Sequence, residues 1–300
     1  MVRAYRFVQV DVFTERALAG NALAVFLEPE GISDGEMQAI AREMNLSETV
    51  FVLPPTRPDC AARLRIFTPT VELPFAGHPT VGTAWVLATR RRLPPGAREL
   101  ALEEGIGPVE VRLEGDPARP GLVWMRHRDP LFDTAVEARD GVALALGLGP
   151  DDLLDAPIEV GSTGNRFLFV PLRQRAAVDR VRLDLAALEA ASGDLDVLGV
   201  FVLAPEPPDR VYSRMLAPGS GVPEDPATGS ASGPLGGYVV RHRLLPADGE
   251  TRLVSEQGTK MGRQSFVHIR LRAEGGRASQ VEVGGATVEV LTGTLTLPPS

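Results

Sequence analysis

The stretch Pro74-Phe75-Ala76-Gly77-His78-Pro79-Thr80-Val81-Gly82 decides the fold, because it joins a strand-like run, residues 63–67, to an apolar helical run, residues 83–88. A Gly followed by a polar residue at a strand-to-helix junction leaves backbone N–H groups directed outward, and the helix dipole adds positive potential there. The turn is therefore suited to an anion. Alone this is a weak signal, since every helix start has such groups.

A second copy of the arrangement strengthens the signal. RMLAP at residues 214–218 repeats RIFTP at residues 65–69, and each leads into a Gly-polar turn, Gly77-His78 in one copy and Gly229-Ser230 in the other. Two earlier blocks also recur, in the same order and about half a chain apart: Gly20-Asn21 with Gly164-Asn165, and VFVL at 50–53 with VFVL at 200–203. Ordered repetition of this kind indicates an internal duplication. We expect two similar lobes that face each other.

Strand-like runs greatly outnumber helical ones, and each lobe has one long helix after its Gly-polar turn, residues 80–92 and 230–243. The first of these helices is apolar on nearly every face, as a helix enclosed by a sheet should be. We therefore expect an α+β fold of two pseudo-symmetric lobes, each a curved, mostly antiparallel β-barrel-like sheet around a central helix. The Gly/Pro-rich residues 115–121 predict a boundary between lobes 1–118 and 119–300, with the last strand able to return to the first lobe.

Composition and missing motifs narrow the function. A net charge of −8 argues against a nucleic-acid-binding surface. The single cysteine, Cys60, and four scattered histidines indicate no disulfide and no metal site. GxSxG, HExxH, a P-loop and a strand-GxGxxG-helix unit are all absent, so we expect no nucleotide cofactor. Neither a secretory signal nor a membrane span is indicated, and we expect a cytoplasmic protein whose chemistry is proton transfer without a cofactor.

Glu48 is the first candidate catalytic residue. It lies between a predicted helix end and the apolar strand 49–53, where partial desolvation would raise its pKa toward the range of a general acid or base. The alternative is a solvated loop glutamate. Aligning the two VFVL blocks places Glu48 opposite Leu198, so duplicated packing does not require an acid here.

His78, Asp225, Thr228 and Ser230 are the other polar candidates. A histidine at a helix start is a poorer cap than Ser or Asp, and its imidazole can shuttle a proton near neutral pH. Asp225 could instead close an Asx turn, and Ser230 could simply cap its helix. If the lobes face each other, the residues of the second turn lie opposite His78.

Three motifs carry a resemblance to a known family: NLSETVF at residues 45–51, PFAGHPTVG at 74–82 and EDPATGSA at 224–231. They resemble the PhzF-like family of phenazine-biosynthesis isomerases over nearly the whole chain. The resemblance implies a diaminopimelate epimerase-like fold with the site in the cleft between the lobes. It also implies that Glu48 moves a proton between two carbons of trans-2,3-dihydro-3-hydroxyanthranilate.

The same resemblance implies roles for the two turns. His78, Asp225 and Ser230 would position the substrate and assist proton movement, while Gly77 and Gly229, with Thr228, would bind its carboxylate. Related epimerases use a thiol at each turn. Here His78 and Ser230 stand at those positions and Cys60 lies elsewhere, which excludes two-thiol racemisation.

Together these observations predict a cofactor-independent isomerase of a small cyclic or amino-acid-like carboxylate, with a homodimer expected from the family. The alternative is a PhzF-like module that binds a metabolite or a protein without turnover. An acid present in one lobe only favours the enzyme.

Overall fold

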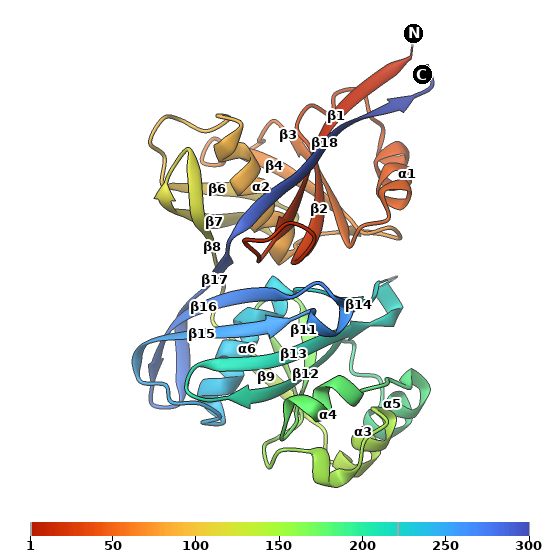
Figure 1. Ribbon diagram of the computed structural model, residues 1–300, viewed down its shortest axis with the longest axis vertical. Coiled ribbons are helices and arrows are strands. Elements are labelled where there is room, and N and C mark those ends of the chain that lie inside the picture. The colour runs from red at the N-terminus through yellow and green to blue at the C-terminus, as the bar shows by residue number, and fades with distance from the viewer. Residues whose placement is uncertain (1, 221, 300) are drawn as a thin grey trace. The chain divides into compact units, whose positions relative to one another are not determined.

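The computed structural model describes residues 2–220 and 222–299 (Figure 1). The chain forms two compact units, one of residues 1–126 with 284–300 and one of residues 127–283. We call them unit 1 and unit 2 and describe each by itself.

Unit 1 is a curved sheet around one buried helix. Its strands pair mostly antiparallel, with β2 parallel to β3 and β4 parallel to β6. Helix α2 lies inside this sheet (Figure 1), and all its residues from Gly77 to Ala88 are buried. The elements of unit 1 are β1 (Arg3–Val12), β2 (Asn21–Phe26), α1 (Asp34–Met44), β3 (Glu48–Leu53), β4 (Ala62–Phe67), β5 (Glu72–Leu73), α2 (Gly77–Thr89), β6 (Glu99–Glu104), β7 (Gly107–Asp116), β8 (Arg119–Arg126) and β18 (Thr287–Leu297).

Unit 2 repeats this scheme around helix α6, whose residues from Gly229 to Val240 are all buried. Helices α3, α4 and α5, shown in green in Figure 1, are added beside its strands. The elements of unit 2 are β9 (Leu131–Ala135), α3 (Arg139–Ala145), η1 (Pro150–Asp152), β10 (Glu159–Ser162), β11 (Arg166–Pro171), α4 (Arg175–Arg180), α5 (Leu185–Ser192), β12 (Gly199–Glu206), β13 (Arg210–Ala217), η2 (Pro218–Ser220), β14 (Val222–Asp225), α6 (Gly229–Arg241), β15 (Gly249–Gln257), η3 (Thr259–Met261), β16 (Ser265–Glu274) and β17 (Arg277–Gly285).

The strand pairings confirm the internal duplication. The parallel pair β2–β3 corresponds to β11–β12, the antiparallel pair β3–β4 to β12–β13, and the parallel pair β4–β6 to β13–β15. Even one ion pair recurs: Arg65 on β4 binds Glu72 on β5, and Arg214 on β13 binds Glu224 on β14. The predicted α+β fold of two similar units, each a curved sheet around a central helix, is confirmed.

The expected boundary at residues 118 and 119 falls on the tight turn between β7 and β8, where Asp116 pairs with Arg119. Gly and Pro mark hairpin turns as readily as linkers. A Gly/Pro-rich composition therefore predicts a turn at residues 115–121, but it does not tell a turn within a unit from a linker between units.

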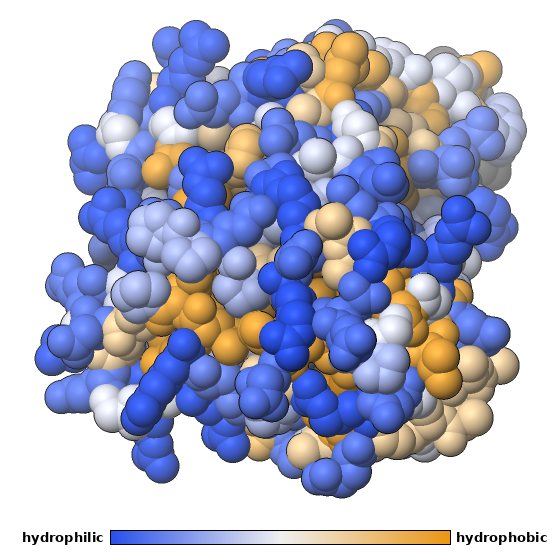
Figure 2. Space-filling view, turned by 60° about the horizontal axis from the view of Figure 1, so that its bottom comes forward, coloured by the Kyte–Doolittle hydropathy of each residue, from blue (hydrophilic) through white to orange (hydrophobic). Residues whose placement is uncertain are grey.

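Hydrophilic side chains predominate on the face shown in Figure 2, with hydrophobic atoms visible in the gaps between them. The apolar strand and helix residues are mostly in the two cores. Among the described residues, no helix combines the length and the apolar character needed to cross a bilayer.

Candidate active site

Glu48 is the first residue of β3, and it lies opposite Leu23 of the parallel strand β2. Helix α1 ends just before it, at Asn45, whose left-handed conformation turns the chain into the strand. The Glu48 side chain is only 14% exposed. The fold thus holds a carboxyl group at the polar end of an otherwise buried strand.

His78 lies beside Glu48, in the first turn of α2. Its Nε2 atom is 3.3 Å from Glu48 Oε2, and its Nδ1 atom is 3.2 Å from the side-chain nitrogen of Asn21. Burial lowers the pKa of His78 to about 3, partly opposed by a hydrogen bond with the backbone of Ala22. The imidazole is therefore neutral at neutral pH. If the Asn21 amide nitrogen donates to Nδ1, the ring proton is on Nε2, which lies beside Glu48 Oε2 without forming a hydrogen bond of regular geometry to it.

Asn21 is a site residue that the sequence indicated only as part of a repeated Gly-Asn pair. Its side chain is fully buried. Gly20 makes this placement possible, because it has a φ of 65° and a Cβ there would lie 2.4 Å from the carbonyl oxygen of Val12. The Gly-Asn pair therefore sets the orientation of the His78 ring.

Replacing Asn21 tests this arrangement. Asn21→Leu removes the donor to His78 Nδ1 and leaves a buried acceptor unsatisfied, so we expect a loss of about 1–3 kcal/mol in stability. Turnover should fall by roughly tenfold or more, because the ring proton is no longer fixed on Nε2. The matched control is Asn165→Leu at the repeated position. Equal effects of the two variants on turnover would contradict the role of Asn21.

The start of α2 presents two backbone donors. Ala76 is the N-cap and makes no side-chain cap, and the N–H groups of Gly77 and His78 are in the first turn, where no helical carbonyl precedes them. Pro79 has no N–H, and the Thr80 N–H reaches the Ala76 carbonyl at 3.4 Å. Two adjacent donors at a helix N-terminus suit a carboxylate.

In unit 2 a buried hydrogen-bond network fixes the second turn. The Thr228 hydroxyl donates to Asp225 Oδ2 at 2.6 Å, and the Gln257 side-chain nitrogen donates to the Asp225 carbonyl at 2.7 Å. In return, the Thr228 N–H donates to Gln257 Oε1 at 3.1 Å. Gln257, on β15, carried no signal in the sequence, because its role depends on β15 lying beside the turn.

Ser230 is the second residue of α6 and is almost fully buried. The N-cap is Thr228, and its hydroxyl makes no cap because it is bound to Asp225. The alternative interpretation of Ser230 as a helix cap is therefore wrong. Gly229 and Ser230 open α6 in the same way that Gly77 and His78 open α2.

The predicted site residues thus form two sets. Glu48, Gly77 and His78 lie together in unit 1, and Asp225, Thr228, Gly229 and Ser230 lie together in unit 2. That the two sets form one site stays a prediction.

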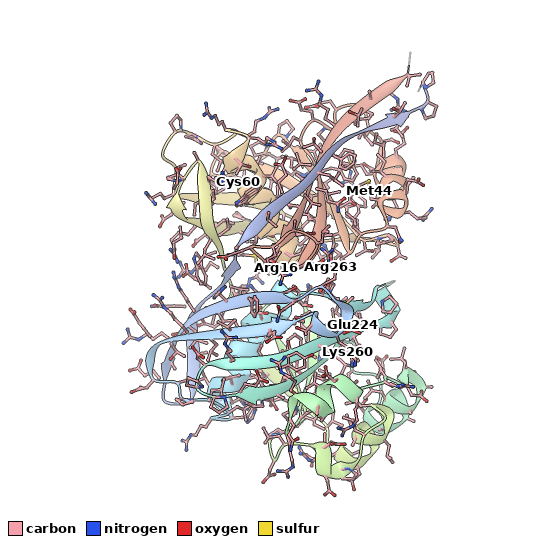
Figure 3. The ribbon with its side chains drawn as sticks, viewed as in Figure 1. Arg16, Met44, Cys60, Glu224, Lys260 and Arg263 are labelled. Carbon is pink, nitrogen blue, oxygen red and sulfur yellow. The ribbon has the colours of Figure 1, made fainter. Side chains whose placement is uncertain are left out.

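The single cysteine takes no part in either set. Cys60 lies on the segment that leads into β4 (Figure 3), and burial raises its pKa. Within the described residues, no group of three or more His, Cys, Asp or Glu side chains is arranged to hold a metal ion.

Comparisons with known proteins agree on one family. Residues 10–293 match the family model described as phenazine biosynthesis-like protein. The chain is 39% identical over 282 residues to trans-2,3-dihydro-3-hydroxyanthranilate isomerase of Pseudomonas aeruginosa, covering 94% of this chain and 95% of the relative. It is 38% identical over 306 residues to an uncharacterized isomerase of Mesorhizobium japonicum, covering 96% and 98%.

Solved structures show the same likeness. The PhzF-family protein of Bacillus anthracis superposes with a TM-score of 0.87 at 26% identity, covering 98% of this chain and 99% of that one. A hydroxyproline epimerase from Agrobacterium vitis shares the fold at 11% identity, with a TM-score of 0.68 and coverage of 98% and 93%. The chain therefore belongs to the phenazine biosynthesis-like family, in which its curated relatives are named isomerases.

Proposed function

We propose that this isomerase acts without a cofactor on a small cyclic or amino-acid-like carboxylate, and that Glu48 carries the proton. The 3.3 Å contact between Glu48 and a neutral His78 is the observation that supports this most strongly. The substrate class rests on the relatives named trans-2,3-dihydro-3-hydroxyanthranilate isomerase, two of which align with this chain over 95% and 100% of their length.

A neutral histidine suits a glutamate that must both take up and release a proton. A charged partner would bind the carboxylate in a permanent ion pair, whereas an uncharged Nε2–H orients one oxygen and leaves the other available. Burial excludes the charged form of His78, because its pKa is lowered to about 3. His78 thus positions Glu48 and need not transfer a proton itself.

The two helix starts would bind the substrate carboxylate. The N–H groups of Gly77 and Gly229 each stand at the beginning of a buried thirteen-residue helix, and a helix N-terminus favours an anion. In this proposal Asp225, held by Thr228, and Ser230 bind the other polar groups of the substrate.

We propose a homodimer, on the family resemblance alone, and a cytoplasmic location. Sedimentation of the purified chain tests the dimer.

The test of function compares turnover with binding. We expect conversion of trans-2,3-dihydro-3-hydroxyanthranilate, or of a related cyclic carboxylate, and competitive binding of the stable analogue 3-hydroxyanthranilate. Binding of the analogue without turnover of any carboxylate offered would favour the alternative, a binding module.

A further inference from the structure

A buried carboxyl group that the proposed chemistry does not use lies against the first turn of α2. Glu104 is the last residue of β6 and is 5% exposed, and its Oε1 atom is 2.5 Å from the hydroxyl oxygen of Thr80, which is fully buried. This contact has no local signal in the sequence, because 24 residues separate the two side chains.

Counting protons at this contact shows which group donates. The Thr80 hydroxyl oxygen is also 2.7 Å from the carbonyl oxygen of Ala76. A hydroxyl has one proton and cannot donate fully to both acceptors. A protonated Glu104 resolves the conflict, since its O–H donates to Thr80 and the Thr80 O–H then donates to Ala76. An ionised Glu104 would leave one buried acceptor without its donor, which costs free energy.

The surroundings also favour the neutral acid. Burial raises the pKa of Glu104 to about 8, against smaller opposing effects of the Thr80 hydroxyl and the Ala76 backbone. Oε2 is buried and has no hydrogen-bond partner of regular geometry within the described residues. No charged group is among the causes of the shift. The ionisable residues on the elements around Glu104 are Arg63 and Arg65 on β4, Glu72 on β5, His78 on α2, Glu99 and Glu103 on β6, and Glu110, Arg112, Glu114 and Asp116 on β7.

The helical hydrogen bonding at this turn is weak. Ala76 offers no side-chain cap, and the first helical hydrogen bond, from Thr80 N–H to Ala76, is long at 3.4 Å. Gly105, the residue after β6, also contacts the segment before the helix. The backbone of Pro74 lies so close to it that a Cβ at Gly105 would be 2.8 Å from Pro74 Cα. The end of β6 therefore supports the whole entry into α2.

We propose that Glu104 is a positioning residue that acts as a neutral carboxylic acid: through Thr80 it fixes the Ala76 carbonyl, and with it the turn that carries Gly77 and His78. This inference rests on the proposed function in treating that turn as part of the active site. Ionisation of Glu104 at alkaline pH breaks the chain of donors, loosens the turn and lowers activity.

The protonation state can be measured without any substrate. In the infrared difference spectrum between the wild type and Glu104→Gln at neutral pH, we expect the carbonyl band of a protonated carboxyl group, which disappears well above pH 8. If the substitution instead removes only the bands of an ionised carboxylate, Glu104 is charged at neutral pH and the proposal is overturned. This result does not depend on whether the protein converts a substrate.

Stability gives a second readout that needs no activity. The native state keeps the Glu104 proton up to about pH 8, whereas the unfolded chain releases it near pH 4.5. The native state therefore binds more protons between these values, and the contribution of Glu104 is complete below pH 4.5 and lost as pH rises toward 8. The melting temperature of Glu104→Gln relative to the wild type should rise across this window, by roughly 5 °C or more.

Glu103→Gln is the matched control, from the same strand. The side chain of Glu103 is half-buried, and hydrogen bonds with Thr56 lower its pKa, so it does not titrate in this window. The difference between its melting temperature and that of the wild type should stay constant across this pH window. If the melting-temperature difference between Glu104→Gln and the wild type is also constant across the window, the proposal is wrong.

The kinetic readout connects Glu104 to the site. On a substrate that the wild type converts, the alkaline fall of kcat/KM should be absent in Glu104→Gln and present in Glu103→Gln, because an amide can donate to Thr80 at every pH. An alkaline fall that is the same in all three proteins would show that Glu104 does not position the turn. If no substrate is converted, the proposed function fails, while the infrared and melting results still decide whether Glu104 is the neutral acid.

Discussion

Glu48→Gln should reduce kcat by about 10²–10⁴-fold or more, because general acid–base groups contribute that much and Glu48 is proposed as the sole proton carrier. Glutamine keeps the size and most hydrogen bonds of glutamate, including an oxygen that can accept from His78 Nε2, which lies 3.3 Å from the carboxylate. It cannot take up and release a proton. The loss should therefore appear in kcat, with the affinity for 3-hydroxyanthranilate little changed.

Two further variants sharpen this prediction. Glu43→Gln removes an exposed glutamate near the end of α1 and should leave turnover as it is. Glu48→Asp keeps an acid but withdraws it by one methylene, so its turnover should lie between the wild type and Glu48→Gln. A Glu48→Gln enzyme that loses both turnover and analogue binding would show damage to the site, and one with wild-type turnover would exclude Glu48 as the catalyst.

Arg214→Met should destabilise the protein by about 3–5 kcal/mol, the cost typical of removing one partner from a buried ion pair. The Arg214 guanidinium binds both oxygens of Glu224 at 2.8 Å and the carbonyls of Val178 and Val181 at 3.0 Å. Its side chain is 9% exposed. Methionine fills much of the same space but leaves these acceptors without a donor. Since Glu224 (labelled in Figure 3) precedes Asp225, the second turn should loosen as well.

The duplication supplies the control. Arg65 occupies the corresponding position of unit 1 and binds Glu72 and Asp34, but both of those carboxylates are exposed. Arg65→Met should therefore cost only about 1 kcal/mol. Urea unfolding of the two variants beside the wild type measures the difference. A loss for Arg65→Met as large as that for Arg214→Met would show that burial does not set the cost.

The fold was predictable because its signals are local and repeated. The two RxxxP blocks lie at the ends of β4 and β13, and the two VFVL segments lie in β3 and β12. The apolar run after Gly77 is helix α2. A helix that is apolar on all its faces has to be buried, and with so many strands in the chain a surrounding sheet is what buries it. Pairing partners far apart in sequence, such as β1 with β18, left no local signal.

The site was only partly predictable, for the same reason. Glu48 and His78 are marked by their own motifs, and the structure brings them into contact. Asn21, Glu104 and Gln257 act through partners 57, 24 and 29 residues away, His78, Thr80 and Thr228 respectively. Such side chains look like ordinary polar residues until tertiary structure buries them. Of these three residues, only Asn21 had a local sequence signal, the repeated Gly-Asn pair.

The central claim, that Glu48 moves the proton, is tested most directly by turnover in deuterated water with the product analysed for its label. If the proton held by Glu48 exchanges with solvent during turnover, the wild-type product should carry deuterium at the reprotonated carbon. If the site is shielded from solvent, the substrate's own hydrogen should return to that carbon. In either case Glu48→Gln should form almost no product and Glu43→Gln should reproduce the wild-type labelling. Product from Glu48→Gln with the wild-type label and rate would contradict the account.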